Sequence, residues 1–516
     1  MGGKALVLDD GDKVAVAVAA IDPGPVEILG DMVFQCAAAE SIPAGHKMAL
    51  RDMARGTVVL KYGRSIGIAT RDIPAGSWVH GHNLRSGLVG QGSARGGYPR
   101  LDGPYSWAGR ERALAVLERA PRTFRGYQRA DGSVGTRNEL WVVPTVGCVN
   151  GSARMIAELA RSEFGLEAQS LEHPYGCSQL GDESDGDLGR TRRMLARLVL
   201  HPNAAAAIVV SLGCENNSLP DFKAELDHLD GGSGIDPRRI AFLPLQEVGD
   251  EVEEARRLLK SLAAFIGSQQ RRDLPLSALS IGLKCGGSDG FSGITANPLV
   301  GRLCDLVVAA GGRAIMTEVP EMFGAEDDLI SHSATGGVHD RFTAMLDGFK
   351  DYYASRGLEL YENPSPGNRD GGITTLEEKS LGCIRKAGSA PVTDILPYGG
   401  RAIESGLSLV SGPGNDLVSS TALAAAGAQE ILFTTGRGTP FGSVVPTIKI
   451  SSTTGLAERK PRWTDFDAGR ILAGFSFDDL AVELLTKVVA VAGGEATAAE
   501  SGGHRGMAIF KDGVTL

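Results

Sequence analysis

From about residue 124 onward, short apolar runs alternate with glycine-rich loops and helical patterns. This alternation is typical of parallel sheets that are covered by helices. It predicts an α/β region with Rossmann-like units. Strands are expected at Leu140–Val143, Ala206–Leu212, Leu279–Leu283, Arg313–Thr317, Leu407–Val410 and Glu430–Thr434, and helices at Ser152–Ser162, Leu299–Ala309 and Leu417–Ala425.

The first 90 residues have a different pattern. Short β-rich runs (Lys13–Val18, Thr57–Leu60 and Ser77–Val79) alternate with Gly, Pro and Asp turns, which predicts an all-β domain over residues 1–90. Residues 91–123 are rich in Gly, Arg and Pro and are expected to form a linker with one short helix at Glu111–Arg119. The α/β region is expected to divide near Ser268–Pro275 into domains at 124–270 and 271–516.

The composition narrows the class of protein. With 42% hydrophobic and 22% charged residues, the 516-residue chain has the composition of a soluble globular protein. Its net charge of -10 disfavours nucleic acid and anionic membranes as main partners. No signal peptide is evident, and no apolar run approaches the ~18 residues of a membrane span. Seven cysteines without a secretion signal suggest a cytoplasmic location with free thiols or metal ligands.

Cysteines recur in glycine-rich loops that follow expected strands. Ligands bind beyond the carboxyl ends of strands in open α/β sheets, so several such loops could build one soft-metal site from distant residues. No CxxC spacing exists, which argues against a zinc ribbon or a ferredoxin-type cluster. The alternative is that these cysteines are small buried apolar residues, as we expect for Cys36 and Cys304. The candidate ligands are Cys148, Cys177, Cys214 and Cys285.

Histidines and acids offer further candidates. His80 and His82 would point to the same side of a strand, which suits a divalent ion or a substrate carboxylate; turn or surface histidines are the alternative. His173 neighbours Cys177 and could be a ligand or a proton carrier. Acids at strand ends are candidate ligands or bases, although exposed loop acids are common: Glu215, Asp289, Glu318 and Glu321.

Three basic residues lie in glycine-rich loops: Arg137, Lys386 and Arg437. Arginine holds a carboxylate through two parallel hydrogen bonds, so these residues are candidates for binding an acidic substrate. The GPGND and GGSDG loops match neither GxGxxG nor a P-loop, so a nucleotide is not supported.

Long strings in order along the chain resemble the altronate/galactarate dehydratase family. They include IPAGHKMAL, DIPAGSWVHGHN, GSVGTRNELWVVPTVGCVNG, HPYGCSQLGD, GLKCGGSDGFSGITANP, TEVPEMFGAE, YENPSPGNRDGGITTLEEKSLGC and TTGRGTP. The resemblance implies an N-terminal SAF domain of β-clip type and a C-terminal region with Rossmann-like topology. It also implies dehydration of a sugar acid with Fe(2+), an iron-sulfur cluster or Mn(2+). The VHGHN, VPEMFGAE and YENPSPGN strings resemble the branch of the family that uses altronate.

The implied reaction removes water across C2–C3 of D-altronate and gives 2-dehydro-3-deoxy-D-gluconate. The C2 proton is weakly acidic and hydroxide is a poor leaving group, so a metal ion, a general base and a general acid would all help. Within this resemblance we expect catalytic roles for His46, Lys47, His173 and Glu318, the first two as acid/base or anchoring groups. Substrate binding is expected from Arg137, Asn138, Asn368, Lys386 and Arg437. Iron would sit on the four thiols, with His80 and His82 as a rival site.

One departure from the family pattern concerns Asp9. Family members often carry His shortly before a DNVAVA string, whereas this chain has Asp9 in that place and Lys13 for Asn. If the His contacts metal or substrate, Asp9 must substitute for it or the site has changed. Two other functions stay open: a family lyase acting on a galactarate-like aldarate or sulfolactate, and a non-catalytic sugar-acid-binding protein. A homo-oligomer is expected.

Overall fold

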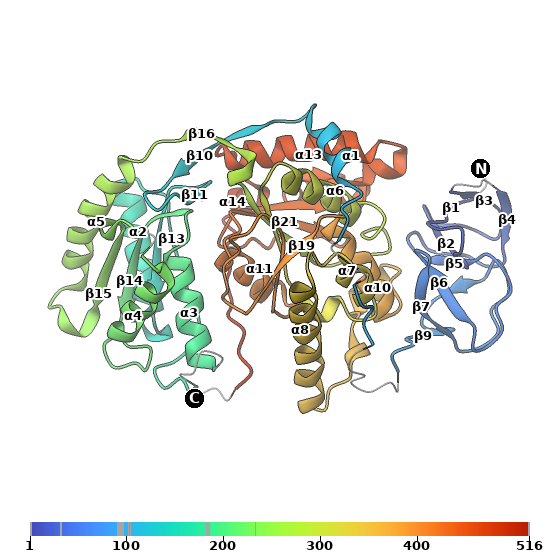
Figure 1. The fold of residues 1–516 in the computed structure, drawn as a ribbon, viewed down its shortest axis with the longest axis horizontal. Coiled ribbons are helices and arrows are strands. Elements are labelled where there is room, and N and C mark those ends of the chain that lie inside the picture. Colours follow the sequence, from blue (N-terminus) through green and yellow to red (C-terminus); the bar gives the residue numbers. More distant parts are fainter. Residues whose placement is uncertain are drawn as a thin grey trace.

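The computed structural model contains three domains (Figure 1). The C-terminal domain lies in the middle, the β-rich N-terminal domain on its right and the second domain on its left. The mixed α/β architecture expected from the sequence is confirmed. The expected linker falls partly outside the described residues, at 90–96, 102 and 104. The structure describes residues 3–30, 34–89, 97–101, 103, 105–181, 186–232 and 234–513.

The N-terminal domain consists of strands and turns, with no helix in its described residues. Its strands form a six-stranded sheet, β4-β3-β1-β2-β5-β8, and a three-stranded sheet, β6-β7-β9. Alternating apolar positions such as Val26 and Ile28 of β3 belong to the core of the six-stranded sheet. The strands are β1 (Gly3–Leu6), β2 (Val14–Ala17), β3 (Gly24–Leu29), β4 (Phe34–Ala38), β5 (Lys47–Ala49), β6 (Val58–Lys61), β7 (Arg64–Ala69), β8 (Trp78–Val79) and β9 (Leu84–Arg85).

A small sheet joins the two α/β domains. The chain enters the second domain through β10 (Thr123–Gln128) and β11 (Val134–Gly135) and leaves it through β16 (Arg272–Pro275). β10 pairs antiparallel with both other strands, so the two connections run side by side. Before them, α1 (Arg110–Leu117) packs on the C-terminal domain.

The second domain has a parallel sheet in the order β13-β12-β14-β15. Its two central strands are entirely buried, as continuous apolar runs in a doubly covered parallel sheet should be. Helices α2 and α5 cover one face, and α3 and α4 pack with the other face toward the C-terminal domain. The elements are β12 (Glu139–Pro144), β13 (Ala168–Ser170), β14 (Ala204–Ser211), β15 (Ile240–Pro244), α2 (Asn150–Phe164), α3 (Asp187–Val199), α4 (Leu219–Asp230) and α5 (Glu251–Gly267).

The C-terminal domain is built on a seven-stranded parallel sheet in the order β19-β20-β18-β17-β21-β22-β23. From β17 the chain first builds β18 on one side and later places β21 on the other. Ligands of open α/β sheets bind at such a reversal, beyond the carboxyl ends of the strands. The strands are β17 (Ser280–Cys285), β18 (Arg313–Met316), β19 (Val392–Leu396), β20 (Gly406–Val410), β21 (Glu430–Thr435), β22 (Thr447–Ser451) and β23 (Phe466–Asp467).

Helices surround this sheet, and its core continues into the N-terminal domain. Side chains of β6 and β7, such as Val59 and Ile66, belong to the same apolar cluster as those of α6 and β17. None of the helices in the described ranges is both long and apolar enough to cross a membrane. The helices are α6 (Ala296–Ala309), α7 (Glu326–Ile330), α8 (Gly336–Ser355), α9 (Pro366–Asp370), α10 (Leu376–Cys383), α11 (Asp416–Ala425), α12 (Thr454–Arg459), α13 (Phe477–Ala492) and α14 (Ala498–Ser501).

Candidate active site

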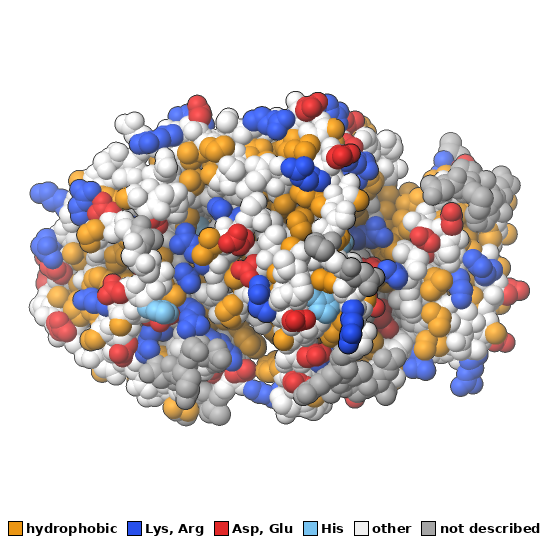
Figure 2. Space-filling view, viewed as in Figure 1, with side chains coloured by type: hydrophobic (Ala, Val, Ile, Leu, Met, Phe, Trp, Pro, Cys, Tyr) orange, Lys and Arg blue, Asp and Glu red, His pale blue; other side chains and the backbone are white. Residues whose placement is uncertain are grey.

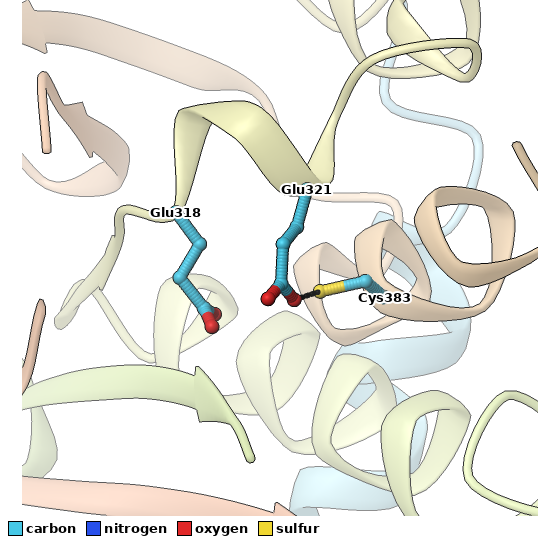
Figure 3. A group of neighbouring side chains, drawn as sticks. All are labelled: Glu318, Glu321 and Cys383. Carbon is cyan, nitrogen blue, oxygen red and sulfur yellow. Dashed lines mark hydrogen bonds between the residues drawn. The ribbon is translucent and has the colours of Figure 1, made fainter. Parts of the chain in front are cut away.

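A cluster of lysines, carboxylates and thiols lies at the carboxyl ends of the central strands. Glu318 and Glu321 come from the turn after β18, and their side chains point into the same space as Cys383 of α10 (Figure 3). The end of β17 and the short helix Ile384–Ala387 complete the group. All its members are buried except the partly exposed Lys379. They are Lys284, Cys285, Glu318, Glu321, Lys379, Cys383 and Lys386.

Each carboxylate of this cluster has an ammonium partner. Glu318 pairs with Lys284 and, at 2.8 Å, with Lys386. Glu321 pairs with Lys379 at 3.0 Å. Buried charges are tolerated when they are paired and hydrogen-bonded in this way. The cluster is therefore a closed network of opposite charges.

Glu318 has an unusual backbone. Its φ of 70° and ψ of 46° lie in the left-handed region, which a bulky residue seldom adopts. Among the described residues other than glycine, it shares a positive φ with Tyr62 alone. This conformation directs one carboxylate oxygen at the backbone N–H of Cys285, 3.2 Å away. Such strain, where the surroundings enforce it, is a frequent mark of functional residues.

The two carboxyl groups differ in proton affinity. Burial raises the pKa of Glu318, in spite of the ammonium groups of Lys284 and Lys386. Burial alone would also raise the pKa of Glu321, but Lys379, with help from the other lysines, lowers it to about 2. Glu318 is therefore the better proton acceptor of the two.

The two thiols are also distinct. The Cys285 sulfur lies 2.7 Å from the Ser288 hydroxyl, and a hydrogen bond from Cys383 together with the Lys386 ammonium holds its pKa well below the ordinary value. The Cys383 thiol lies 3.3 Å from a Glu321 oxygen. Its hydrogen bond with Cys285 and its burial raise its pKa. One thiol is thus set up as a thiolate and the other as a proton donor.

Among the described residues, Glu318, Glu321 and Cys383 are the group whose ligand atoms lie within 4.8 Å of one another, close enough to hold one ion. The negative charges of Glu318 and Glu321 are already matched by Lys284, Lys379 and Lys386. A divalent ion would add uncompensated positive charge to a buried place. As folded, the cluster fits proton transfer and anion binding better than cation binding.

The N-terminal domain covers this region through Lys47 and Lys61. Both ammonium groups pair with Glu378 of α10, at 2.8 and 2.9 Å. Lys47 donates its other hydrogen bonds to Gly372 O and the Thr374 hydroxyl, which leaves it no free N–H. Between Lys61 and the loop after β17 remains a cavity of about 10 Å³, room for one water at most. Of the two expected roles, the geometry favours anchoring for Lys47.

His46 and His80 lie at the same interface. Nδ1 of His46 accepts a hydrogen bond from Trp78 at 3.1 Å, and its Nε2 lies 3.2 Å from Asp370 O. His80 contacts the Thr374 hydroxyl at 3.0 Å, and burial lowers its pKa to about 4. His82 is exposed in the turn after β8. Because these histidines occupy a turn rather than a strand, the structure does not form the rival His80–His82 metal site.

Arg137 and Asn138 lie at the start of β12, away from the cluster. All five N–H groups of Arg137 are used, two on Glu500 at 2.9 Å and three on backbone carbonyls. Asn138 is held between Arg129 and Ile266 O. The structure therefore corrects the substrate-binding role expected for both residues, since Arg137 has no N–H left for a ligand and both ends of the Asn138 amide are hydrogen-bonded within the protein.

His173 is also structural. Its Nε2 lies 3.0 Å from Pro144 O, and its Nδ1 accepts the N–H of Tyr175 at 3.3 Å. Burial lowers its pKa to about 4, so it stays neutral near pH 7. The expected roles of ligand or proton carrier are corrected, because both ring nitrogens are engaged in fixing the loop that carries Cys177.

The four expected thiol ligands fall into two places. Cys285 ends β17 of the seven-stranded sheet, whereas the other three lie in loops after β12, β13 and β14 of the second domain. The latter loops are joined by backbone bonds, Gly147 N to Tyr175 O at 2.7 Å and Asn216 N to Cys177 O at 2.8 Å. Cys148 and Cys214 are exposed. The structure therefore corrects the single four-thiol site: Cys285 lies in another domain than the remaining three thiols, Cys148, Cys177 and Cys214, called here the thiol trio.

Three further candidates border the cluster or lie apart from it. Asn368 donates to Ser288 O at 2.8 Å and so holds the loop after β17. The exposed Arg437 donates its backbone N–H to Gly287 O at 2.9 Å, and its guanidinium has no partner among the described residues. It remains available for an acidic ligand. Asp9 lies in an exposed turn of the N-terminal domain, where it accepts the N–H of Gly11.

Sequence reasoning missed Lys284, Lys61 and Glu378. The first two are charged residues inside apolar strand sequences, SIGLKC and VVLK. A lysine in such a run is costly to bury without a partner, and that cost was the available signal. Glu378 carried no comparable signal, because it lies in a charged helical stretch, TTLEEKS.

The fold and the cluster are those of an α/β enzyme in which acids, lysines and thiols are buried together beneath an all-β domain. Three family models match it: the altronate/galactarate dehydratase SAF domain at 3–87, the D-galactarate dehydratase/altronate hydrolase second domain at 126–266, and the D-galactarate/altronate dehydratase C-terminal domain at 276–515.

Similar proteins span nearly the whole chain. It is 45% identical over 514 residues to altronate dehydratase of Escherichia coli K12, covering 98% of both chains. It is 45% identical over 484 residues to altronate dehydratase of Bacillus subtilis 168, covering 92% and 93%. Identity to galactarate dehydratase (L-threo-forming) of E. coli K12 is 32% over 501 residues, covering 91% and 90%. The chain belongs to the D-galactarate/altronate dehydratase family of hydro-lyases, and its N-terminal domain is the SAF domain.

Proposed function

We propose that this protein dehydrates D-altronate to 2-dehydro-3-deoxy-D-gluconate. The 45% identity to two altronate dehydratases, against 32% to a galactarate dehydratase, favours altronate over an aldarate. The observation that carries the chemistry is Glu318, a strained and buried carboxylate held between two ammonium groups at the point where the sheet order reverses.

The first proton transfer is from C2 of the substrate to Glu318. A carboxylate with a raised pKa is a stronger base than an exposed one, and this suits removal of a weakly acidic proton. Negative charge then develops on the substrate carboxylate as an enediolate. The ammonium groups of Lys284 and Lys386, whose pKa values are raised by the surrounding acids in spite of burial, stabilise that charge.

The second transfer is to the departing C3 hydroxyl. Cys383, kept protonated by its raised pKa, lies 2.7 Å from Lys386 and supplies this proton in the proposal. The C2 enol of the resulting unsaturated acid then takes up a proton at C3 and becomes the 2-oxo acid. Arg437 binds the substrate carboxylate in this scheme, while Asn368 positions the Ser288 loop.

Iron is proposed to bind the thiol trio, Cys148, Cys177 and Cys214. Thiolates are soft ligands that suit iron, whereas Mn(2+) prefers oxygen ligands. The trio does not form a group with ligand atoms within 4.8 Å, as a single ion would need. An iron-sulfur cluster places its own atoms between the thiolates, so it does not require the three sulfurs to lie as close together as one Fe(2+) does. When bound, the group would supply Lewis-acid character.

Hydrogen bonds of buried polar groups hold the loops of the trio together. The Glu215 carboxylate accepts the N–H groups of Gly213 and Cys214, at 2.7 and 3.0 Å, and the Thr145 hydroxyl at 2.6 Å. Thr145 directly follows β12, so this contact ties the loop carrying Cys214 to the loop carrying Cys148. Such supporting contacts around ligands usually hold them in place.

The decisive experiment offers anaerobically purified enzyme D-altronate, galactarate and sulfolactate and measures 2-oxo acid formation. We expect turnover of altronate with the highest kcat/KM. Preference for galactarate or sulfolactate would move the protein to another branch of the family, and binding without turnover of any of the three would support a sugar-acid-binding protein.

Finer features of the fold and setting belong to the same proposal. The parallel strand order and flanking helices support a Rossmann-like topology for both α/β domains. A cytoplasmic location and a homo-oligomer are proposed from the sequence and the family.

A further inference from the structure

A second cleft lies on the opposite edge of the seven-stranded sheet. It has a volume of about 640 Å³ and runs between the second and C-terminal domains. Its walls include the start of β18 and the residues just before β21, which are the amino ends of strands whose carboxyl ends carry the Glu318 cluster. The cleft is therefore separate from the proposed dehydration centre.

Three arginines from three elements face this cleft: Arg197 of α3, Arg313 at the start of β18 and Arg401 between β19 and β20. Arg197 donates to Gly399 O at 3.1 Å. The guanidinium groups of Arg313 and Arg401 make no hydrogen bond or ion pair with any residue that the structure describes. Elsewhere the chain pairs arginines with acids: Arg137 with Glu500, Arg193 with Glu225, Arg256 with Glu163, Arg341 with Asp394, Arg470 with Glu483 and Arg505 with Glu139.

The lining of the cleft holds fewer acids than arginines. Asp131 and Asp230 are the acidic residues of its lining. One Asp131 oxygen is occupied by the backbone N–H and hydroxyl of Ser133, at 3.0 and 2.7 Å. With three arginines against two acids in its lining, the cleft keeps an excess of positive charge in a chain whose net charge is -10.

Repulsion between the arginines of the cleft contributes to their lowered pKa values. Burial and then the charge of Arg401 lower the pKa of Arg197 to about 10, and the same two causes lower the pKa of Arg313. Behind the wall, His201 has its pKa lowered to about 3 by burial, with Arg401 among the further causes. An anion between the guanidinium groups would relieve this repulsion.

We propose that this cleft binds a small polyanion that carries at least two carboxylate or phosphate groups. Guanidinium forks match both groups, and the volume lies in the usual range for small-molecule sites. Because Arg197 belongs to the second domain and the other two arginines to the C-terminal domain, the anion bridges the domains and fixes their arrangement. The inference is independent of the proposed dehydration.

The test titrates full-length protein with citrate, with inorganic phosphate and, as a neutral control, with glycerol, by calorimetry and by thermal unfolding. We expect saturable binding of at least one anion and a rise in Tm, since a ligand of the native state stabilises it. Whichever of citrate and phosphate binds more tightly identifies the preferred group. The double variant Arg313→Gln/Arg401→Gln should bind about tenfold more weakly or worse, with KM for altronate unchanged.

Two further variants guard the interpretation. Arg55→Gln removes an exposed arginine of the SAF domain and should bind as the parent does. Arg401→Lys keeps the charge but loses the fork, and should give an intermediate affinity even if the double variant folds poorly. Unchanged anion affinity in Arg401→Lys and in the double variant would overturn the proposal, as would absence of saturable binding in the parent. If these variants change the sedimentation behaviour of the protein but keep full anion binding, the proposal is wrong and the cleft instead forms contacts between copies of the chain.

Discussion

The carboxyl edges of the two parallel sheets carry different chemistries. At the edge of the seven-stranded sheet, Glu318 and its lysine partners are buried and charge-matched beneath the SAF domain. At the edge of the four-stranded sheet, Cys148 and Cys214 are exposed on loops that a buried polar frame holds together. The same position in two parallel sheets thus holds a buried, charge-matched cluster in one domain and exposed thiols in the other, which we propose act in proton transfer and in iron binding.

The difference follows from what covers each edge. Lys47 and Lys61 place the SAF domain over α10, where burial strengthens every ion pair and shifts proton affinities. On the face shown in Figure 2, acidic and basic side chains are interspersed, so no single-sign field dominates it. Burial, rather than strand-end position alone, therefore distinguishes the two edges.

The largest expected effect comes from Glu318→Gln. Loss of the proposed base should lower kcat for altronate by about 10³-fold, with a smaller change in KM. The exposed Glu404→Gln is the matched control and should keep full activity. If thermal unfolding shows that Glu318→Gln is folded, and its kcat stays within about tenfold of the parent, the base lies elsewhere.

Glu378→Gln tests the contact between the SAF and C-terminal domains. It leaves the buried Lys47 and Lys61 without their anion, so unfolding should become easier by about 3–5 kcal/mol. Denaturant unfolding measures this change in the free energy of unfolding. Glu27→Gln is the control, because the ion pair of Glu27 with Lys4 is at the surface and contributes less than about 1 kcal/mol. If Glu378→Gln loses no more free energy of unfolding than Glu27→Gln, the buried pairs of Glu378 do not hold the domains together.

The pH dependence of the same contact has a definite sign. Lys47 and Lys61 lower the pKa of Glu378 to about 2 against the opposing effect of burial, from an ordinary value of 4.5. Stability from this carboxylate is therefore complete above about pH 4.5 and is lost as the pH falls toward 2. Small-angle scattering across that window should show the SAF domain separating at acid pH, and earlier in Glu378→Gln. A SAF domain that stays docked at pH 2 would contradict this linkage.

Much of the fold was predictable because buried parallel strands are continuous apolar runs. Leu140–Val143 and Leu407–Val410 were expected as strands and lie within β12 and β20. The loops after them were also recognisable from their glycines. What the sequence could not tell is whether the carboxyl ends of strands in the two α/β domains form one site, and for that reason Cys285 was grouped with three thiols of the other domain.

For the site, loop position after a strand was enough to select Glu318, which lies in the turn after β18, but its role stays a prediction. Arg137 was misassigned because its partner, Glu500, is 363 residues away in sequence and turns an apparent ligand-binding group into a structural one. Lys284 was overlooked because its partner Glu318 follows β18 and no residue near Lys284 in the sequence indicates this pairing. Long-range charge pairing is thus the information that local patterns lack.

The thiol trio can be separated from the buried centre by its metal content. Cys177→Ser and Cys214→Ser should each lower bound iron and acid-labile sulfide about tenfold in protein purified without oxygen. Cys285→Ser and Cys383→Ser are the matched controls at the other edge and should keep their iron. The reverse pattern would place iron in the Glu318 cluster and remove the distinction between the two edges.

The smallest effect on turnover itself is expected at Arg437. Arg437→Ala removes a charged hydrogen bond to the substrate carboxylate and should raise KM by an amount equivalent to about 1.5–3 kcal/mol, with kcat little changed. Arg137→Ala is the contrasting variant. It removes the ion pair with Glu500, so it should lower Tm while leaving the KM of folded enzyme unaltered. An unchanged KM in Arg437→Ala would leave carboxylate binding to the lysines of the buried centre alone. The free guanidinium at the end of β21 would then have no part in substrate recognition.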